Sequence, residues 1–136
     1  MSLTAQQIRL VQQSFAKVEP IADQASAIFY QKLFEIDPSL RRLFKHDMSE
    51  QGKMLMGTLK VAVHGLNDLS KIVPVLHKLA ERHVGYGVLP EHYTLVGNAL
   101  LRTLKAGLGD EFTEETREAW VATYRLMAQA MKAHAY

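Results

Sequence analysis

The histidines are the residues of this sequence whose chemistry depends most on where the fold places them. His83 lies near the end of a helical segment that Gly85 and Gly87 terminate. The residues before it at helical spacing are apolar: Ile72, Val73, Val75, Leu76 and Leu79. Such an imidazole can face the core and bind a metal, although a hydrogen-bonded core or surface histidine explains the same pattern. The other histidines have weaker claims to ligation: His46, His64, His77, His92 and His134.

A series of amphipathic helices must position these side chains. Apolar residues recur at spacings of three and four along almost the whole chain, and no stretch alternates with a period of two for long enough to indicate a sheet. The sequence therefore predicts an all-α fold. The expected helices span 4–17, 20–36, 38–43, 50–66, 70–84, 90–107 and 114–133. Because the connections are short, we expect one domain over 1–136.

Capping residues and prolines mark the helix starts. Thr4 with Gln7 forms a capping-box pair, and Asp37, Ser49 and Thr113 each precede a helical run. Prolines are expected in first helical turns, where a missing N–H has no intrahelical partner. Those that we expect there are Pro20, Pro38, Pro74 and Pro90.

Composition excludes several classes of function. The chain has 136 residues, of which 48% are hydrophobic and 22% charged, as in an ordinary globular domain. Its basic residues do not cluster, so we expect no nucleic-acid partner. There is no cysteine, which excludes disulfides, thiolate metal sites and covalent attachment of haem through a C-x-x-C-H motif. Residues 1–17 contain neither a signal-peptide core nor a membrane span, and we expect a cytoplasmic protein with no membrane partner.

Five short motifs follow one another along nearly the whole chain. They are Phe29 to Phe34, Leu43-Phe44, Glu50 to Lys53, His83 with Gly87-Val88, and His92-Tyr93 through Val96-Gly97 to Leu100-Leu101. Their order and spacing resemble those of the bacterial globins, and more closely the single-domain haemoglobins and the haem domains of flavohaemoglobins. The resemblance implies a globin fold that holds one haem b (iron protoporphyrin IX) without a covalent bond.

The resemblance makes His83 the proximal iron ligand and Phe44 the ring that packs on the porphyrin face. Tyr93 matches the tyrosine that hydrogen-bonds the ligating histidine, a role that orients the imidazole. A buried packing tyrosine is the alternative reading of Tyr93. The further cofactor contacts are Leu79, Val88 and Val96, with Lys53 and Arg82 either at the haem propionates or simply solvated.

On the distal side, the resemblance places Tyr30, Gln51 and Leu55. Phenolic and amide hydrogens favour iron ligands that become partly anionic, as oxygen does. Each such hydrogen bond could add about 1.5–3 kcal/mol in a dry pocket, so we expect tight oxygen binding. From the residues alone, a packing tyrosine and a capping or solvated glutamine remain alternatives. With glutamine at position 51, we expect an open sixth site, although His46 could act as an internal ligand.

The proximal network of the flavohaemoglobins also contains a glutamate late in the last helix. Counted from Trp120, that position holds Ala135, and the last acidic residue is Glu118. A glutamate there makes the imidazole more anionic and promotes oxygen activation. Its replacement therefore favours oxygen binding over peroxidase-like chemistry.

Three functions follow from the resemblance. The first is reversible binding of oxygen, with CO and NO as further ligands, for storage, delivery or scavenging. The second is nitric oxide dioxygenase activity, for which a separate flavin reductase is expected because the sequence ends at Tyr136 without reductase domains. The third is a haem-free regulatory module of globin-like fold, which the retention of His83 and Phe44 disfavours.

Overall fold

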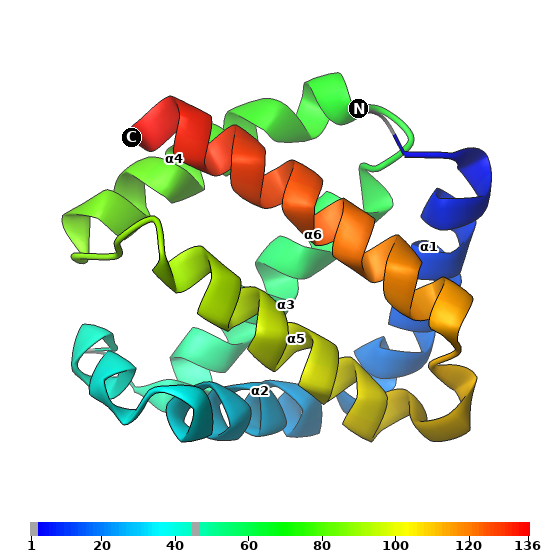
Figure 1. The fold of residues 1–136 in the computed structure, drawn as a ribbon, viewed down its shortest axis with the longest axis horizontal. Helices are drawn as coiled ribbons and strands as arrows, with labels where there is room; N and C mark the ends of the chain where they lie inside the picture. Colours follow the sequence, from blue (N-terminus) through cyan, green and yellow to red (C-terminus); the bar gives the residue numbers. More distant parts are fainter. Residues whose placement is uncertain (1–2, 45–46) are drawn as a thin grey trace.

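The structure is a computed structural model that describes residues 3–44 and 47–136, so the alternative ligand His46 lies outside the described residues. Within those ranges the chain forms α-helices and short 3₁₀ segments but no strand, as the all-α prediction requires (Figure 1). The elements are α1 Ala5–Val18, η1 Glu19–Ile21, α2 Ala22–Ile36, η2 Pro38–Leu43, α3 Met48–His64, α4 Leu69–Gly85, α5 His92–Leu108, η3 Gly109–Glu111 and α6 Glu114–Ala135.

Local signals in the sequence fix three of the helix starts in the described residues. Thr4 and Gln7 form the expected capping box, with both backbone-to-side-chain distances 3.0 Å. Asp37 accepts from the Ser39 N–H at the start of η2. Thr113 caps α6 through the Thr116 N–H at 3.2 Å. These contacts satisfy N–H groups that have no partner inside the helix, which is why the predicted and observed starts agree here.

Three predicted starts are wrong. Ser49 lies inside α3, which begins one residue earlier after Asp47. Pro90 lies in the turn before α5 and accepts from the N–H of the third residue on, so it precedes the first helical turn. Pro74 lies inside α4, beyond its first turn, because that helix already begins at Leu69. With no N–H, Pro74 leaves the carbonyl of Ser70 without its usual helical donor.

Trp120 of α6 is the centre of the core. Its side chain is 0% exposed, and its indole N–H donates to the hydroxyl of Ser14 on α1 at 2.8 Å. The largest helix contacts join α2 with α5, α1 with α6, α4 with α6, and α2 with α3. In Figure 1, α6 (orange to red) runs across the molecule with α1 and α4 on either side of it. Within the described residues, α4 has its extensive contacts with α6 alone.

The buried apolar side chains divide into two clusters. The first contains Tyr30 and Trp120 and is built mainly from α1, α2, α5 and the first part of α6. The second contains Tyr93 and packs α4 against the last turns of α6. Tyr124 contacts both clusters. Because α4 is attached through α6, its candidate ligand His83 belongs to the side of the molecule that carries the second cluster.

The crossing of α2 and α3 depends on a glycine. A Cβ at Gly52 would lie 2.6 Å from the Oγ and 3.0 Å from the Cβ of Ser26. Ser26 is buried, and its hydroxyl donates to the Asp23 carbonyl at 3.0 Å. The two helices therefore approach more closely than any larger residue at position 52 permits.

Gly52→Ala is expected to lower the free energy of unfolding by about 1–3 kcal/mol, because the new methyl overpacks this crossing. Gly57→Ala is the matched control on the same helix, since a Cβ there meets nothing within 4 Å. It should stabilise by up to about 1 kcal/mol through helix propensity. Urea unfolding of both variants checks the prediction. Ser26→Ala should recover part of the loss in the double variant, and equal effects of the two glycine substitutions would contradict the close approach.

Candidate functional site

The imidazole of His83 sits in the last turns of α4. The ring is half-buried, and its Nδ1 is enclosed by the protein without a hydrogen-bond partner. Burial lowers the pKa of His83, which favours the neutral imidazole that metals bind. Since Nδ1 is enclosed, Nε2 is the nitrogen that could bind a metal.

Tyr93 of α5 lies beside this imidazole. The two ring centroids are 6.1 Å apart and the rings meet edge to face. Tyr93 is buried, and its hydroxyl has no hydrogen-bond partner among the residues that the structure describes. Burial, with the neighbouring Tyr136 phenol, raises the pKa of Tyr93 to about 12. A buried polar atom without a hydrogen-bond partner lowers the stability of a protein by about 1–3 kcal/mol. Two such atoms on neighbouring rings therefore indicate that this site is not arranged for stability alone.

A group of three aromatic rings forms on the other side of the molecule. Tyr30 and Phe34 of α2 stack with centroids 6.1 Å apart. Phe44, which ends η2, meets Tyr30 at 5.3 Å and Phe34 at 5.6 Å, in both cases edge to face. The turn through η2 thus returns Phe44 onto α2, and its ring is half-buried beside the phenol of Tyr30.

The hydroxyl of Tyr30 points to the start of α3. It donates to the backbone carbonyl of Gln51 at 3.1 Å, and the tyrosine is 8% exposed. Burial raises the pKa of Tyr30 to about 12, so the phenol keeps its proton and remains a donor at any physiological pH. The structure therefore brings Tyr30 and Gln51 together, but through the glutamine backbone. The half-buried Gln51 side chain does not cap α3.

The other predicted contact residues separate by cluster. Leu55, Phe44 and Val96 pack on the first cluster with Tyr30. Leu79 and Val88 pack on the second cluster with Tyr93. The contact of each of these residues with a haem stays a prediction. Lys53 and Arg82 are exposed, and their contact with a cofactor stays a prediction.

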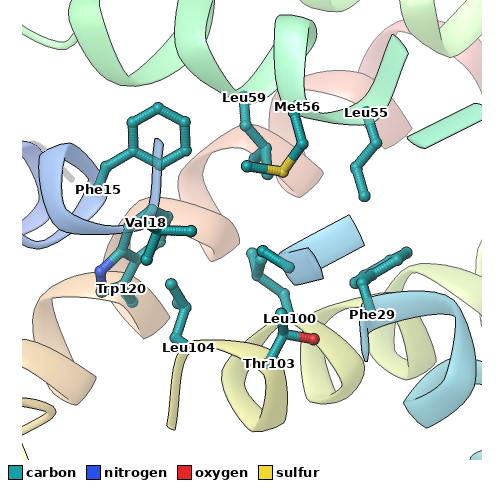
Figure 2. A pocket seen from close by; sticks show the side chains of 11 residues that line it. Phe15, Val18, Phe29, Leu55, Met56, Leu59, Leu100, Thr103, Leu104 and Trp120 are labelled. Carbon is teal, nitrogen blue, oxygen red and sulfur yellow. The ribbon is translucent and has the colours of Figure 1, made fainter. Parts of the chain in front are cut away.

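Behind Leu55 lies a small apolar cavity of about 10 Å³. Figure 2 shows Leu55, Met56 and Leu59 of α3 facing Leu100 and Leu104 of α5 across it. A space of that size holds one small molecule at most. Sequence analysis did not find the cavity, because its walls come from helices that are distant in sequence.

Sequence analysis also missed two side chains around Tyr93. The hydroxyl of Tyr124 donates to the Tyr93 carbonyl at 2.6 Å. The ammonium of Lys132 lies 6.0 Å from the centroid of the Tyr93 ring. Ala135, where the resemblance places a glutamate, packs on the second cluster. The only signal for these residues was the helical spacing of Tyr124, which predicted a core position and no more.

Comparisons with known proteins cover nearly the whole chain. A family model described as globin matches residues 27–131. Flavohemoprotein A of Dictyostelium discoideum is 36% identical over 136 residues, 96% of this chain and 33% of its own length. The flavohemoprotein of Vibrio cholerae is 28% identical over 130 residues, 93% of this chain and 33% of its own length. The chain thus spans about a third of the length of these relatives.

One solved structure has nearly the same backbone. It is an engineered carbene transferase, and the Rhodothermus marinus protein from which it was made is provisionally named a nitric oxide dioxygenase. The TM-score is 0.90 at 26% sequence identity, and the match covers 98% of this chain and 94% of that chain.

Proposed function

The chain belongs to the globin family, and from this membership we propose that it binds one b-type haem through His83 and binds oxygen reversibly on the opposite face of that haem. The family implies haem binding. When bound, haem supplies an iron that can take up a diatomic gas. The observation that carries the proposal is the half-buried imidazole of His83, whose enclosed Nδ1 leaves Nε2 for the iron.

The apolar surroundings fit a flat hydrophobic group. Phe44 and Leu55 belong to one cluster of side chains and Leu79 and Val88 to the other, so a group held between the clusters would contact both. Tyr93 lies against the imidazole with a free hydroxyl, and a hydrogen bond between this hydroxyl and Nδ1 would fix the ring orientation. Such a bond would also remove two unsatisfied buried groups at once.

Tyr30 would act on the bound gas. Its phenol keeps its proton, so the hydroxyl can donate to the Gln51 carbonyl, as it does here, or to a partly anionic ligand. The side chain of Gln51 would supply a second donor. Tyr30 is buried in the first apolar cluster, where a hydrogen bond is stronger than in water.

The proximal side favours binding over activation of oxygen. Within the described residues no carboxylate hydrogen-bonds the Nδ1 of His83, and Ala135 packs where the resemblance places a glutamate. The ammonium of Lys132 lies 6.0 Å from the centroid of the Tyr93 ring. An ammonium cannot accept a hydrogen bond, so it does not polarise the imidazole N–H as a carboxylate would.

Nitric oxide dioxygenation is a second candidate function. It is favoured by the flavohemoprotein relatives and by the name of the Rhodothermus marinus protein. In that role the protein would combine nitric oxide, oxygen and one electron into nitrate. The electron would come from a flavin reductase.

Haem titration of the purified protein tests the proposal. We expect saturation at one haem per chain, and a reduced protein whose visible spectrum changes on adding oxygen and returns when oxygen is removed. Nitrate formed on mixing the oxygen-loaded protein with nitric oxide, and repeated turnover with a flavin reductase, would support the second candidate. A protein that retains no haem would instead favour the regulatory module. Within the described residues no helix is long and apolar enough to cross a membrane.

A further inference from the structure

Tyr136 follows the last turn of α6 and reaches the connection between α4 and α5. Its hydroxyl donates to the backbone carbonyl of Val88. Its ring meets the ring of Tyr93 edge to face, with centroids 6.3 Å apart and an interplanar angle of 88°. The side chain is nevertheless 51% exposed, so it lies over the buried Tyr93 as a cover and not as part of the core.

These contacts close a loop that includes the candidate iron ligand. The N–H of Val88 donates to the carbonyl of His83 at 2.9 Å, and the carbonyl of Val88 accepts from Tyr136. Tyr136 packs on Tyr93, and Tyr93 packs on the ring of His83. The side chain of Tyr136 therefore joins three segments: the end of α4, the connection after it and the start of α5.

The ring of Tyr93 depends on packing for its orientation. Its hydroxyl has no hydrogen-bond partner, and Tyr124 holds only its backbone carbonyl. The connection between α4 and α5 turns at Gly87, which adopts a φ of 91° that glycine tolerates at low energetic cost. Leu89 on that connection is 47% exposed and is held locally by hydrogen bonds with His92. Tyr136 adds a contact from the end of α6 to both the connection and the ring of Tyr93.

We propose that Tyr136 is a positioning residue for the proximal side: it holds Val88 and the ring of Tyr93, and through them sets the orientation of the His83 imidazole. It acts where the flavohaemoglobin pattern has a carboxylate and this chain has Ala135, but through packing and a backbone hydrogen bond, not through charge. This inference rests on the proposed haem ligation by His83.

The test compares Tyr136→Leu and Tyr136→Phe with Tyr86→Leu and Tyr86→Phe. Tyr86 is a matched control, because it lies on the same connection and is 48% exposed, close to the 51% of Tyr136. The readouts on the haem-loaded protein are the iron–histidine stretching band in resonance Raman spectra and the rate of haem transfer to an apoglobin acceptor.

Tyr136→Leu should shift or broaden the iron–histidine band and speed haem loss roughly threefold to tenfold, the effect of one lost hydrogen bond and its packing. Tyr136→Phe keeps the ring over Tyr93, so it should keep the band position and lose haem only moderately faster. Both Tyr86 variants should match the parent protein. An unchanged band in Tyr136→Leu, or an equal shift in Tyr86→Leu, would overturn the proposal even if haem loss accelerates.

Failure of haem binding is a separate outcome. If the parent protein takes up no haem, the proposed function is wrong, and the positioning role is judged on the haem-free protein by NMR. The ring signals of Tyr93 and His83 should then change in Tyr136→Leu and stay fixed in Tyr86→Leu. Unchanged ring signals in both variants would overturn the inference independently of the haem.

Discussion

His83→Ala is expected to abolish stable haem binding. Loss of a residue that only orients a metal ligand typically weakens metal affinity 10- to 100-fold, so loss of the ligand itself should weaken haem affinity by more than roughly 100-fold. The measurement is haem titration followed by absorbance, with haem loss to an apoglobin acceptor as the second readout. Exogenous imidazole should restore part of the spectrum in His83→Gly, because it can occupy the vacated position.

The haem-free state separates a ligand role from a structural one. Because Nδ1 of His83 is enclosed without a partner, its removal should leave the free energy of unfolding of the haem-free protein nearly unchanged. His77→Ala is the control on the same helix, since His77 stacks on His134 with ring centroids 4.0 Å apart and is not among the candidate haem residues. Equal haem affinity of the parent and His83→Ala would refute ligation by His83.

Tyr30→Phe is expected to speed oxygen release roughly 10- to 150-fold, the equivalent of a charge-assisted hydrogen bond worth about 1.5–3 kcal/mol. The phenylalanine ring preserves the contacts of Tyr30 with Phe34 and Phe44, so the packing of α2 should persist. Stopped-flow displacement of oxygen by CO measures the release rate. Release of CO, which carries little negative charge, should change far less.

Gln51→Ala provides the comparison for that result. The Tyr30 hydroxyl bonds to the backbone of Gln51, so this variant removes the amide donor while leaving the tyrosine contact in place. If oxygen release is unchanged in Tyr30→Phe but faster in Gln51→Ala, the phenol stays on the backbone carbonyl and glutamine is the donor. If neither variant releases oxygen faster, the distal assignment is wrong.

Much of the helical architecture was predictable because its causes are local. The capping pair of Thr4 and Gln7 and the cap at Thr113 satisfy N–H groups within three residues of chain, so the sequence alone contains both partners. The helical spacing of Trp120 with Tyr124, Met127 and Met131 favours a core position for Trp120, which is fully buried. The predicted globin fold is confirmed by the family match and by the TM-score of 0.90.

Local reasoning failed where packing overrides a residue's preference. Pro74 favours a helix start, yet it lies inside α4, beyond the first turn. Burial of Ile72 and Leu76 on either side of it supplies contacts that compensate for one missing hydrogen bond. Ser49 is a good capping residue, but α3 begins before it.

The identities of the candidate site residues came from the order of five motifs, since neither His83 nor Tyr30 has an unambiguous role when considered alone. The sequence by itself determined the helices, the core tryptophan and the residues that the globin resemblance selects. Only the tertiary structure decided that the Tyr30 hydroxyl meets a backbone carbonyl and that Tyr136 lies over Tyr93. It also decided that His83 and Tyr93 each carry a buried polar atom without a hydrogen-bond partner in the described part of the chain. These relations join residues on different helices, and their distances depend on how the helices cross, which the spacing of residues along a chain does not specify.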